Sequence, residues 1–423
     1  MAITPRLAAI FFSLLCCRSA SSLRPPNLIS NSSGGVITHL PGFQGPLPFH
    51  LQTGYVEVDE DNGVHLFYYF VRSEREDSPG DDPVVLWLTG GPGCSVLTGL
   101  AYEIGPLSFD LNGYVGGLPK LVYKQDSWTK WFDKYPQFFS SPLYIAGDSY
   151  SGMIVPTVTS EIARGKEEGS QPNLNLKGYL VGNPVTDFNF DGPSRIPFAH
   201  GMGLISDEIY ECIKGISPNH VLEPLCAFAS PKPKLISSGA REMLQLPVPV
   251  HTEEEEEELR LSEISLQCRT AGYMMSSMWA NDASVRQALG IHKGTVPSWS
   301  RCNYDIPYTN DIPSAVKYHL DVTTKGYRSL VYNGDHDMVV PFIGTQAWIR
   351  SLNFSTVDEW RPWFVDGQVA GYIIQPGYLC RFTRSYSNNL TFATVKGGGH
   401  TAPEYMPRQC FAMFVRWVSG DPL

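Results

Sequence analysis

The sequence predicts a fold of the α/β class, in which buried parallel strands alternate with helices. Residues 143–147, 330–334 and 392–395 are short, mainly apolar runs of strand length that lead into turns. A residue able to do chemistry follows each run, namely Ser149, Asp337 and His400 in turn. Because the carboxyl ends of parallel strands meet at one edge of a sheet, we expect these three side chains to lie together.

The first of these runs ends in the segment 147–152, Gly-Asp-Ser-Tyr-Ser-Gly, and a helix-compatible stretch follows at 153–163. A serine in such a strand–turn–helix sits on a tight bend, with its Oγ above the end of the sheet. Bulk at Gly147 or Ser151 would clash with the helix, and the N–H of Tyr150 becomes a donor for an anion. On these six residues alone, an ordinary strand-to-helix turn is an equally good interpretation.

The order of the three residues along the chain adds to this. Serine, acid and histidine, each just past a strand, is the order of α/β-hydrolase triads. Asp335 and Asp337 both follow the second strand, and spacing alone does not choose between them. His400 follows three glycines, which allow a close approach to another loop. A Ser–Asp–His triad is therefore favoured over a structural histidine.

The N-terminal sequence predicts the cellular location of the protein. Arg6 precedes an apolar run at 7–17, and small residues follow it. This pattern is typical of a cleaved signal peptide, which we assign to 1–22. The run is too short to span a bilayer, and no later uninterrupted apolar stretch is long enough. We expect a protein of the secretory pathway, extracellular or vacuolar, with no part in a membrane.

The core is expected at 23–204 and 276–423, with a lid inserted at 205–275, where periodicity fades and prolines accumulate. The run of glutamates at 253–258 has the character of a solvated segment. The expected elements are a hairpin of strands at 50–58 and 64–72, a buried strand at 83–88, a helix at 96–102, a loop from there to Ser127, a strand at 176–183, a helix from Ser206, and helices at 278–289 and 406–418.

Composition excludes several classes. The net charge of −10 leaves no basic stripe for nucleic acid. No Cys/His spacing suggests zinc, HExxH is absent, and no metal or cofactor is expected. Without the signal peptide, seven cysteines remain, enough for up to three bridges and one left over. Asn31, Asn353 and Asn389 begin glycosylation triplets.

Four segments together resemble the serine carboxypeptidase-like family, most closely its plant branch, which includes acyltransferases. They are 87–95 (Trp-Leu-Thr-Gly-Gly-Pro-Gly-Cys-Ser), 147–152, 333–337 (Asn-Gly-Asp-His-Asp) and 397–403 (Gly-Gly-Gly-His-Thr-Ala-Pro). The resemblance runs from about Ser30 to the C-terminus. It implies an α/β-hydrolase fold with an inserted lid, Asp337 as the acid, an oxyanion hole from the N–H groups of Gly91 and Tyr150, and a Cys94–Cys302 disulfide.

The chain departs from the family between residue 103 and the serine. Family members carry there another buried strand and a longer helix, whereas here 126–130 runs directly into 131–136. The shortfall is about one strand-plus-helix unit, on the order of thirty residues. In this fold the strand lies inside the sheet, so its loss would leave an edge unpaired. A short insertion at 378–382 also interrupts the hairpin that leads to Thr391.

The resemblance implies substrate contacts at Thr89, Gly90, Glu103 and Asp148. Family carboxypeptidases bind a peptide's C-terminal carboxylate with an asparagine and two glutamates, which must share protons. Thr89 replaces the asparagine and Asp148 the glutamate before the serine, which weakens this clamp and resembles the acyltransferases.

The sequence therefore predicts acyl transfer from glucose esters to a small-molecule acceptor, with a small-molecule acyl donor and acceptor as partners. A serine-type carboxypeptidase acting on a peptide C-terminus is one alternative, and a catalytically inactive truncated chain is another. The oligomeric state is left open.

Overall fold

The computed structural model describes residues 36–59, 61–72, 83–112, 114, 116–129, 142–170, 173–204, 271–371 and 383–423. The expected signal peptide, Asn31, the helix from Ser206, most of the expected lid and the insertion at 378–382 lie outside these residues.

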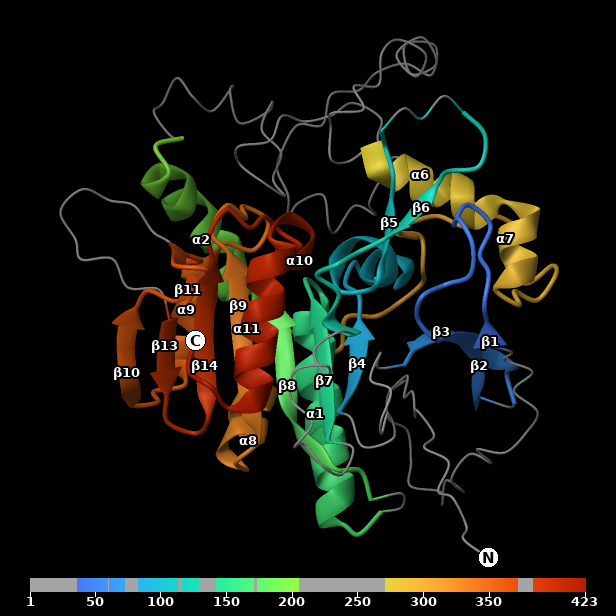
Figure 1. The fold of residues 1–423 in the computed structure, drawn as a ribbon. Helices are drawn as coiled ribbons and strands as arrows, with labels where there is room; N and C mark the ends of the chain where they lie inside the picture. The colour runs from blue at the N-terminus through green and yellow to red at the C-terminus, as the bar shows by residue number, and fades with distance from the viewer. Residues whose placement is uncertain are drawn as a thin grey trace, which may run out of the picture.

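A seven-stranded sheet forms the centre of the described chain, in the order β10-β13-β14-β9-β8-β7-β4 (Figure 1). The strands from β14 to β4 pair in parallel, and β13 and β10 pair antiparallel. Their bounds are β4 Val84–Leu88, β7 Leu143–Asp148, β8 Leu176–Gly182, β9 Arg328–Gly334, β10 Thr356–Arg361, β13 Thr383–Tyr386 and β14 Leu390–Val395. The predicted α/β class is confirmed.

Helices cover both faces of this sheet (Figure 1). On one face α11 (Pro407–Ser419) buries Phe414 and Val415, the apolar side expected for the helix at 406–418. Its Phe414 ring stacks on Trp128, with 4.2 Å between ring centroids. The helices of the other face are α1 (Ser151–Glu167), α2 (Phe188–Gly201), α8 (Val316–Thr324) and α9 (Phe342–Ser351).

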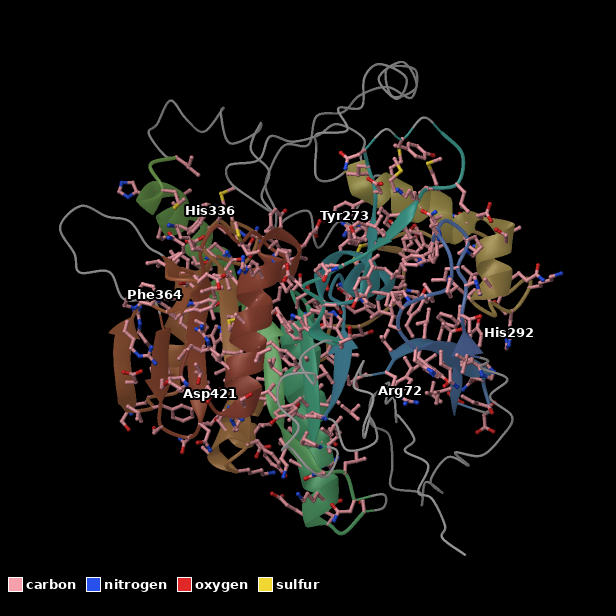
Figure 2. The ribbon with its side chains drawn as sticks, in the orientation of Figure 1. Arg72, Tyr273, His292, His336, Phe364 and Asp421 are labelled. Atoms are coloured by element: carbon pink, nitrogen blue, oxygen red, sulfur yellow. A yellow bond between two sulfur atoms is a disulfide. The ribbon has the colours of Figure 1, made fainter. Side chains whose placement is uncertain are left out.

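A second apolar core lies beside β4 (Figure 1). It is built on a separate three-stranded sheet of β1 (Val36–Ile37), β2 (Leu51–Asp59) and β3 (Val64–Val71), which contains the predicted hairpin. The short π-helix η1 (Gly99–Glu103) and helices α6 (Ala271–Asn281) and α7 (Ala283–Ala288) pack on it. His292, labelled in Figure 2, follows α7 and stacks on Tyr55 of β2 at 4.2 Å between ring centroids.

Two sequence expectations are wrong. The single helix expected at 278–289 is broken at Asp282, which has extended dihedrals and caps α7 by accepting from the N–H groups of Ser284 and Val285. An aspartate that bonds to nearby backbone N–H groups favours such a break. The loop expected before Ser127 contains an antiparallel hairpin of β5 (Leu107–Phe109) and β6 (Leu121–Tyr123).

The remaining elements are small. β11 (Phe364–Val365) and β12 (Gln368–Val369) form a two-stranded ribbon, and α10 (Ala402–Tyr405) precedes α11. Among the described helices, none is both long enough and apolar enough to cross a membrane. Within the described residues, β4 is the last strand of the seven-stranded sheet on the side of the second core.

Candidate active site

Ser149 lies on the turn between β7 and α1, with φ at 56°. Its N–H donates to the carbonyl of Gly182 at 2.9 Å, and its carbonyl accepts from Val185 at 2.9 Å. A Cβ on Gly147 would come within 2.3 Å of the Leu88 carbonyl oxygen and 2.7 Å of the Ser151 Cβ. The left-handed serine is thus held by hydrogen bonds on both sides, on a turn that small neighbours permit.

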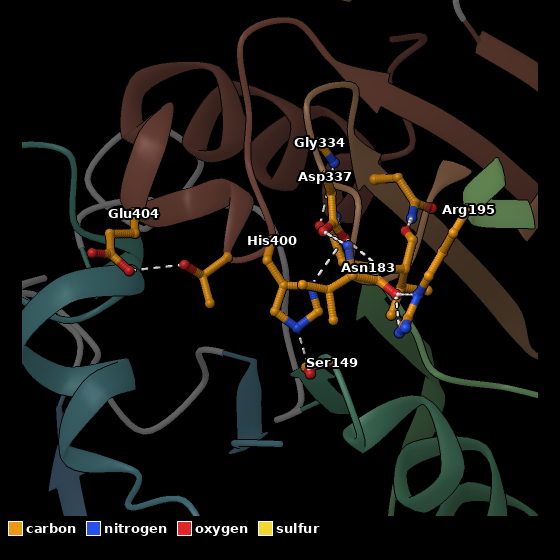
Figure 3. A network of polar contacts seen from close by, with 11 residues as sticks. Ser149, Asn183, Arg195, Gly334, Asp337, His400 and Glu404 are labelled. Carbon is orange, nitrogen blue, oxygen red and sulfur yellow. Dashed lines mark hydrogen bonds and ion pairs between the residues drawn. The ribbon is translucent and has the colours of Figure 1, made fainter. Parts of the chain in front are cut away.

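The three residues expected to meet form one hydrogen-bonded chain (Figure 3). The Ser149 Oγ lies 2.7 Å from His400 Nε2, and His400 Nδ1 lies 2.9 Å from Asp337 Oδ2. Asp335 takes a different partner, because its Oδ1 accepts from the Gly397 N–H at 2.7 Å. Of the two acids that spacing left open, Asp337 is therefore the one that contacts His400.

The environment of His400 favours the charged imidazolium. Burial by itself lowers the pKa of His400, but the charge and hydrogen bond of Asp337 outweigh it, so the pKa lies above its ordinary value. Asp148 acts in the same direction, and the positive charge of Arg195 acts in the opposite one. These surroundings therefore stabilise His400 in the form that has accepted a proton.

The loop after β4 lies directly against the serine turn. A Cβ on Gly90 would be 2.7 Å from the Ser149 Cβ and 2.7 Å from the Tyr150 nitrogen, so only glycine fits there. Within the described chain, neither the N–H of Gly91 nor that of Tyr150 donates to another residue. The Cys94–Cys302 disulfide, as the resemblance implied, joins this loop to the segment before α8.

Comparison with known proteins agrees with this geometry. A family model described as Serine carboxypeptidase matches residues 41–130 and 129–420. The chain belongs to the serine carboxypeptidase family. Serine carboxypeptidase-like 2 of Arabidopsis thaliana is 43% identical over 437 positions, with 92% of this chain and 94% of that protein covered. Serine carboxypeptidase-like 17 of the same plant is 44% identical over 438 positions, with the same shares covered.

Among solved structures, a prohormone-processing carboxypeptidase from Saccharomyces cerevisiae, KEX1(delta)p, has a TM-score of 0.62 at 17% identity, covering 88% of this chain and 91% of that one. This likeness shows the fold. The two plant alignments are longer than the 423 residues of this chain, so those relatives hold residues that it lacks. The two family matches meet at residues 129–130.

Two acids of this serine carboxypeptidase-family chain are buried behind the serine turn. Burial raises the pKa of Asp148 to about 6, although the nearby His400 and the Gly90 N–H lower it. Burial, Asp148 and Glu404 hold the pKa of Glu103 well above its ordinary range, against the opposing effects of Lys124 and of the Trp87 hydrogen bond. Thr89 Oγ1 and Asp148 Oδ1 are buried with no hydrogen-bond partner among the described residues.

Glu404 is a neighbour that sequence reasoning missed. It accepts from Thr401 Oγ1 at 2.8 Å (Figure 3). It also accepts from the hydroxyl of Tyr273 at 2.9 Å, and Tyr273, labelled in Figure 2, comes from α6. Its charge raises the pKa values of both Glu103 and Asp148. The one signal for it in the sequence is its position four residues after His400.

The other predicted sites are placed as follows. The Asn353 and Asn389 side chains are exposed, and Asn389 donates to the Gly326 carbonyl at 3.1 Å. Cys410 is a buried free thiol. In the described ranges, no group of three or more His, Cys, Asp or Glu side chains is arranged to hold a metal ion.

Proposed function

We propose that this chain is a serine carboxypeptidase-like acyltransferase, which moves an acyl group from a glucose ester to a small-molecule acceptor through an acyl-enzyme at Ser149. The observation that carries the proposal is the hydrogen-bonded chain from Ser149 through His400 to Asp337 beside the loop that contains Gly91. Thr89 and Asp148 at the neighbouring positions support transfer over peptide cleavage.

In the first half-reaction, His400 Nε2 takes the Ser149 proton while the Oγ attacks the ester carbonyl carbon. Asp337 accepts from Nδ1 and stabilises the imidazolium that forms. The N–H groups of Gly91 and Tyr150 donate to the oxyanion; one such donor is worth roughly 3 kcal/mol in other enzymes. The carbon–oxygen bond to the sugar then breaks, and His400 returns the proton to the departing sugar hydroxyl.

In the second half-reaction, the acceptor hydroxyl gives its proton to His400 and attacks the acyl-enzyme carbonyl. The same two N–H groups stabilise the second oxyanion. The bond to Ser149 breaks, and His400 reprotonates the Oγ. A water molecule in place of the acceptor gives hydrolysis, so transfer requires that the acceptor occupies the position of that water.

The polar atoms without partners support a hydroxyl-rich donor. Thr89 Oγ1 both donates and accepts, and Asp148 Oδ1 accepts when ionised. A buried polar atom without a partner is costly, so these atoms favour a ligand that completes their hydrogen bonds. Sugar hydroxyls can donate to both oxygens and accept from the Thr89 hydroxyl, whereas a peptide carboxylate can only accept, from the Thr89 hydroxyl or from a protonated Asp148.

A carboxypeptidase is the second candidate, and the raised pKa values of Glu103 and Asp148 favour it. Protonated acids can donate to a substrate carboxylate, as the family's clamp requires. The test compares release of the last residue from a blocked dipeptide with transfer from a hydroxycinnamoyl-glucose to an alcohol. Efficient peptide release without ester transfer would overturn the acyltransferase proposal.

An inactive chain is the third candidate, favoured by the interruption of the family match at 129–130. A fluorophosphonate probe, which reacts with activated serines, separates it from the other two. We expect the wild-type protein to be labelled and Ser149→Ala to be unlabelled. A folded wild-type protein that stays unlabelled would establish the inactive chain instead.

We also propose that the protein enters the secretory pathway and is located outside the cell or in the vacuole. Its support is the charge and apolar pattern of residues 1–22. Expression with a C-terminal tag, followed by N-terminal sequencing of the mature chain, tests it, because a protein that still begins at Met1 would contradict it.

A further inference from the structure

Two side chains that sequence reasoning missed hold the catalytic acid from behind, Asn183 and Arg195 (Figure 3). Asn183 directly follows β8, the strand that lies between β7, which leads to Ser149, and β9, which leads to Asp337. Arg195 comes from α2 and reaches the loop that follows Asp337. Neither one touches Ser149 or His400 through a hydrogen bond within the described chain.

Asn183 contacts both the acid and the strand that carries it. Its Nδ2 donates to Asp337 Oδ2 at 2.7 Å, and its Oδ1 accepts from the Gly334 N–H at 3.2 Å. The side chain is fully buried, and its backbone has φ at 43°. A side-chain amide is uncharged and donates and accepts at separate atoms, so it can make both contacts at once. Asn183 therefore fixes the position of Asp337 Oδ2, the oxygen that contacts His400, relative to β9.

Arg195 fixes the backbone that supports the other side of the carboxylate. Its Nε and Nη2 donate to the Val339 carbonyl at 3.0 and 2.8 Å. The N–H of the same residue, Val339, donates to Asp337 Oδ1 at 2.8 Å, and the Val340 N–H donates to Oδ2 at 3.2 Å. A planar guanidinium presents two donors in a fixed fork, so it sets the orientation of this loop more firmly than a lysine would.

We propose that Asn183 and Arg195 are positioning residues, which hold the Asp337 carboxylate in the orientation that keeps His400 Nε2 aimed at Ser149. The inference rests on the proposed function, because it assigns these residues to the same acyl-transfer site. Small displacements of a catalytic group reduce rates steeply, since the reacting atoms must be aligned. A purely structural role would predict loss of stability with normal chemistry in the molecules that remain folded.

Arg195 has a second, electrostatic effect. The charged groups that act on His400 are Asp337, Asp148 and Arg195, and Glu404 lies on the far side of Thr401. Arg195 is the one cation among them, and its charge lowers the pKa of His400. Removing this charge raises that pKa, so the neutral imidazole required for attack forms at a higher pH. Replacing it with lysine keeps the charge but loses the fork.

The experiment measures the rate of fluorophosphonate inactivation against pH, with melting temperature and active-site titration for each variant. The variants are Asn183→Gly, Arg195→Gln and Arg195→Lys. Glycine is chosen at 183 because it tolerates the positive φ while it removes the amide. Asn388→Gly is the matched control at an exposed position with φ at 61°, and Arg350→Gln is the control for an exposed arginine on the neighbouring α9.

We expect Asn183→Gly to react about tenfold or more slowly than wild type across the pH range. Arg195→Gln should shift the midpoint of the pH profile upward, and Arg195→Lys should react slowly with the midpoint near that of wild type. Both controls should behave as wild type. Variants that match the controls, while wild type reacts at Ser149, would overturn this inference and leave the proposed function standing. A folded wild type that fails to react would overturn both.

Discussion

The ionisation of His400 decides the pH range of the proposed chemistry. Its pKa lies above the ordinary 6.5, so the neutral form that accepts the Ser149 proton appears only as the pH rises above that value. Asp148, which has a pKa of about 6 and is ionised in that range, contributes to this elevation. We expect the wild-type rate of fluorophosphonate inactivation to rise with pH, with a midpoint above 6.5.

Asp148→Asn removes one of the negative charges that favour the imidazolium, so the midpoint should move to lower pH. Asp335→Asn is the matched control, because Asp335 bonds to Gly397 instead of His400. Inactivation profiles of the three proteins, measured side by side, give the comparison. An Asp148→Asn midpoint at or above that of wild type would contradict the electrostatic account.

Because the Asp335 carboxyl is buried, we expect the stability of the protein to depend on pH. Burial raises the pKa of Asp335 to about 7, against the opposing effects of the Gly397 N–H and of Lys396. A carboxyl whose pKa is raised in the folded state makes its full contribution to the stability of the fold at pH values below its unfolded pKa of 3.8. This contribution is lost as the pH rises through about 7. Asn at 335 stays neutral at every pH and keeps an oxygen for Gly397.

The melting temperature of Asp335→Asn relative to wild type should therefore rise between pH 4 and pH 8. Each unit of pKa shift corresponds to about 1.4 kcal/mol, so the gain in the free energy of unfolding should reach a few kcal/mol. Thermal unfolding across that range measures it. A difference between the two proteins that stays constant with pH would show that Asp335 is not protonated in the folded chain.

The residues of the site were predictable to different degrees. Ser149, Asp337 and His400 each follow an apolar run, and parallel strands deliver their ends to one edge. Asn183 also ends a strand run, but its sequence placed it only at the end of the strand expected at 176–183 and gave its side chain no role. Arg195 and Glu404 come from helices, and no local pattern indicates what a helical side chain meets at long range. Their roles needed the packing of α2 and α10.

At the scale of elements, strands were easier to predict than helices. The run at 83–88 is nearly continuous in apolar residues, which predicts a strand buried on both faces. It corresponds to β4, which is half-buried except at Trp87, and the strand expected at 176–183 corresponds to β8. Helix α2 was missed because Pro193 and Pro197 lie inside it. Its start carries a recognisable cap, since Asp187 accepts from the Asn189 N–H at 2.8 Å.

Helix α11 packs against Trp128, which lies just before residues 129–130, where the two family matches meet. The stacked rings of Phe414 and Trp128 lie 10° from parallel, and Trp128 also meets Trp87 of β4 edge-on at 5.5 Å. Phe414→Ala should lower the free energy of unfolding by about 3–5 kcal/mol, because it leaves a cavity among fully buried rings. Chemical denaturation with Trp fluorescence measures both the stability and the ring environment.

Phe364→Ala provides the control, since Phe364 on β11 is 44% exposed. Its substitution should change stability by no more than about 0.5 kcal/mol. Equal effects of the two substitutions would show that the contact between α11 and Trp128 is not formed in solution.

At the scale of the whole molecule, the strand-plus-helix unit that this chain is expected to lack affects how the seven-stranded sheet is joined to the second core. In the described residues β4 pairs with β7 on one side, while the hairpin of β2 and β3 belongs to another sheet. The Val84 N–H donates to Pro142 across the β4–β7 pair. Because alternate residues of a strand direct their N–H groups to opposite sides, those of Val85 and Trp87 are directed away from β7.

We therefore expect the amides of Val85 and Trp87 to exchange with solvent faster than those of Leu86 and Leu88, whose N–H groups are directed toward β7. Hydrogen exchange resolved to single residues measures this.

Insertion of the corresponding segment of Serine carboxypeptidase-like 2 between Thr129 and Lys130 should slow the exchange of Val85 and Trp87 and raise the melting temperature. A strand would then pair with the side of β4 that is directed away from β7. A scrambled segment of equal length is the control. Protection of Val85 and Trp87 in the natural chain would mean that another part of this chain already pairs with β4, and that the sheet is complete without the strand-plus-helix unit that the family resemblance led us to expect.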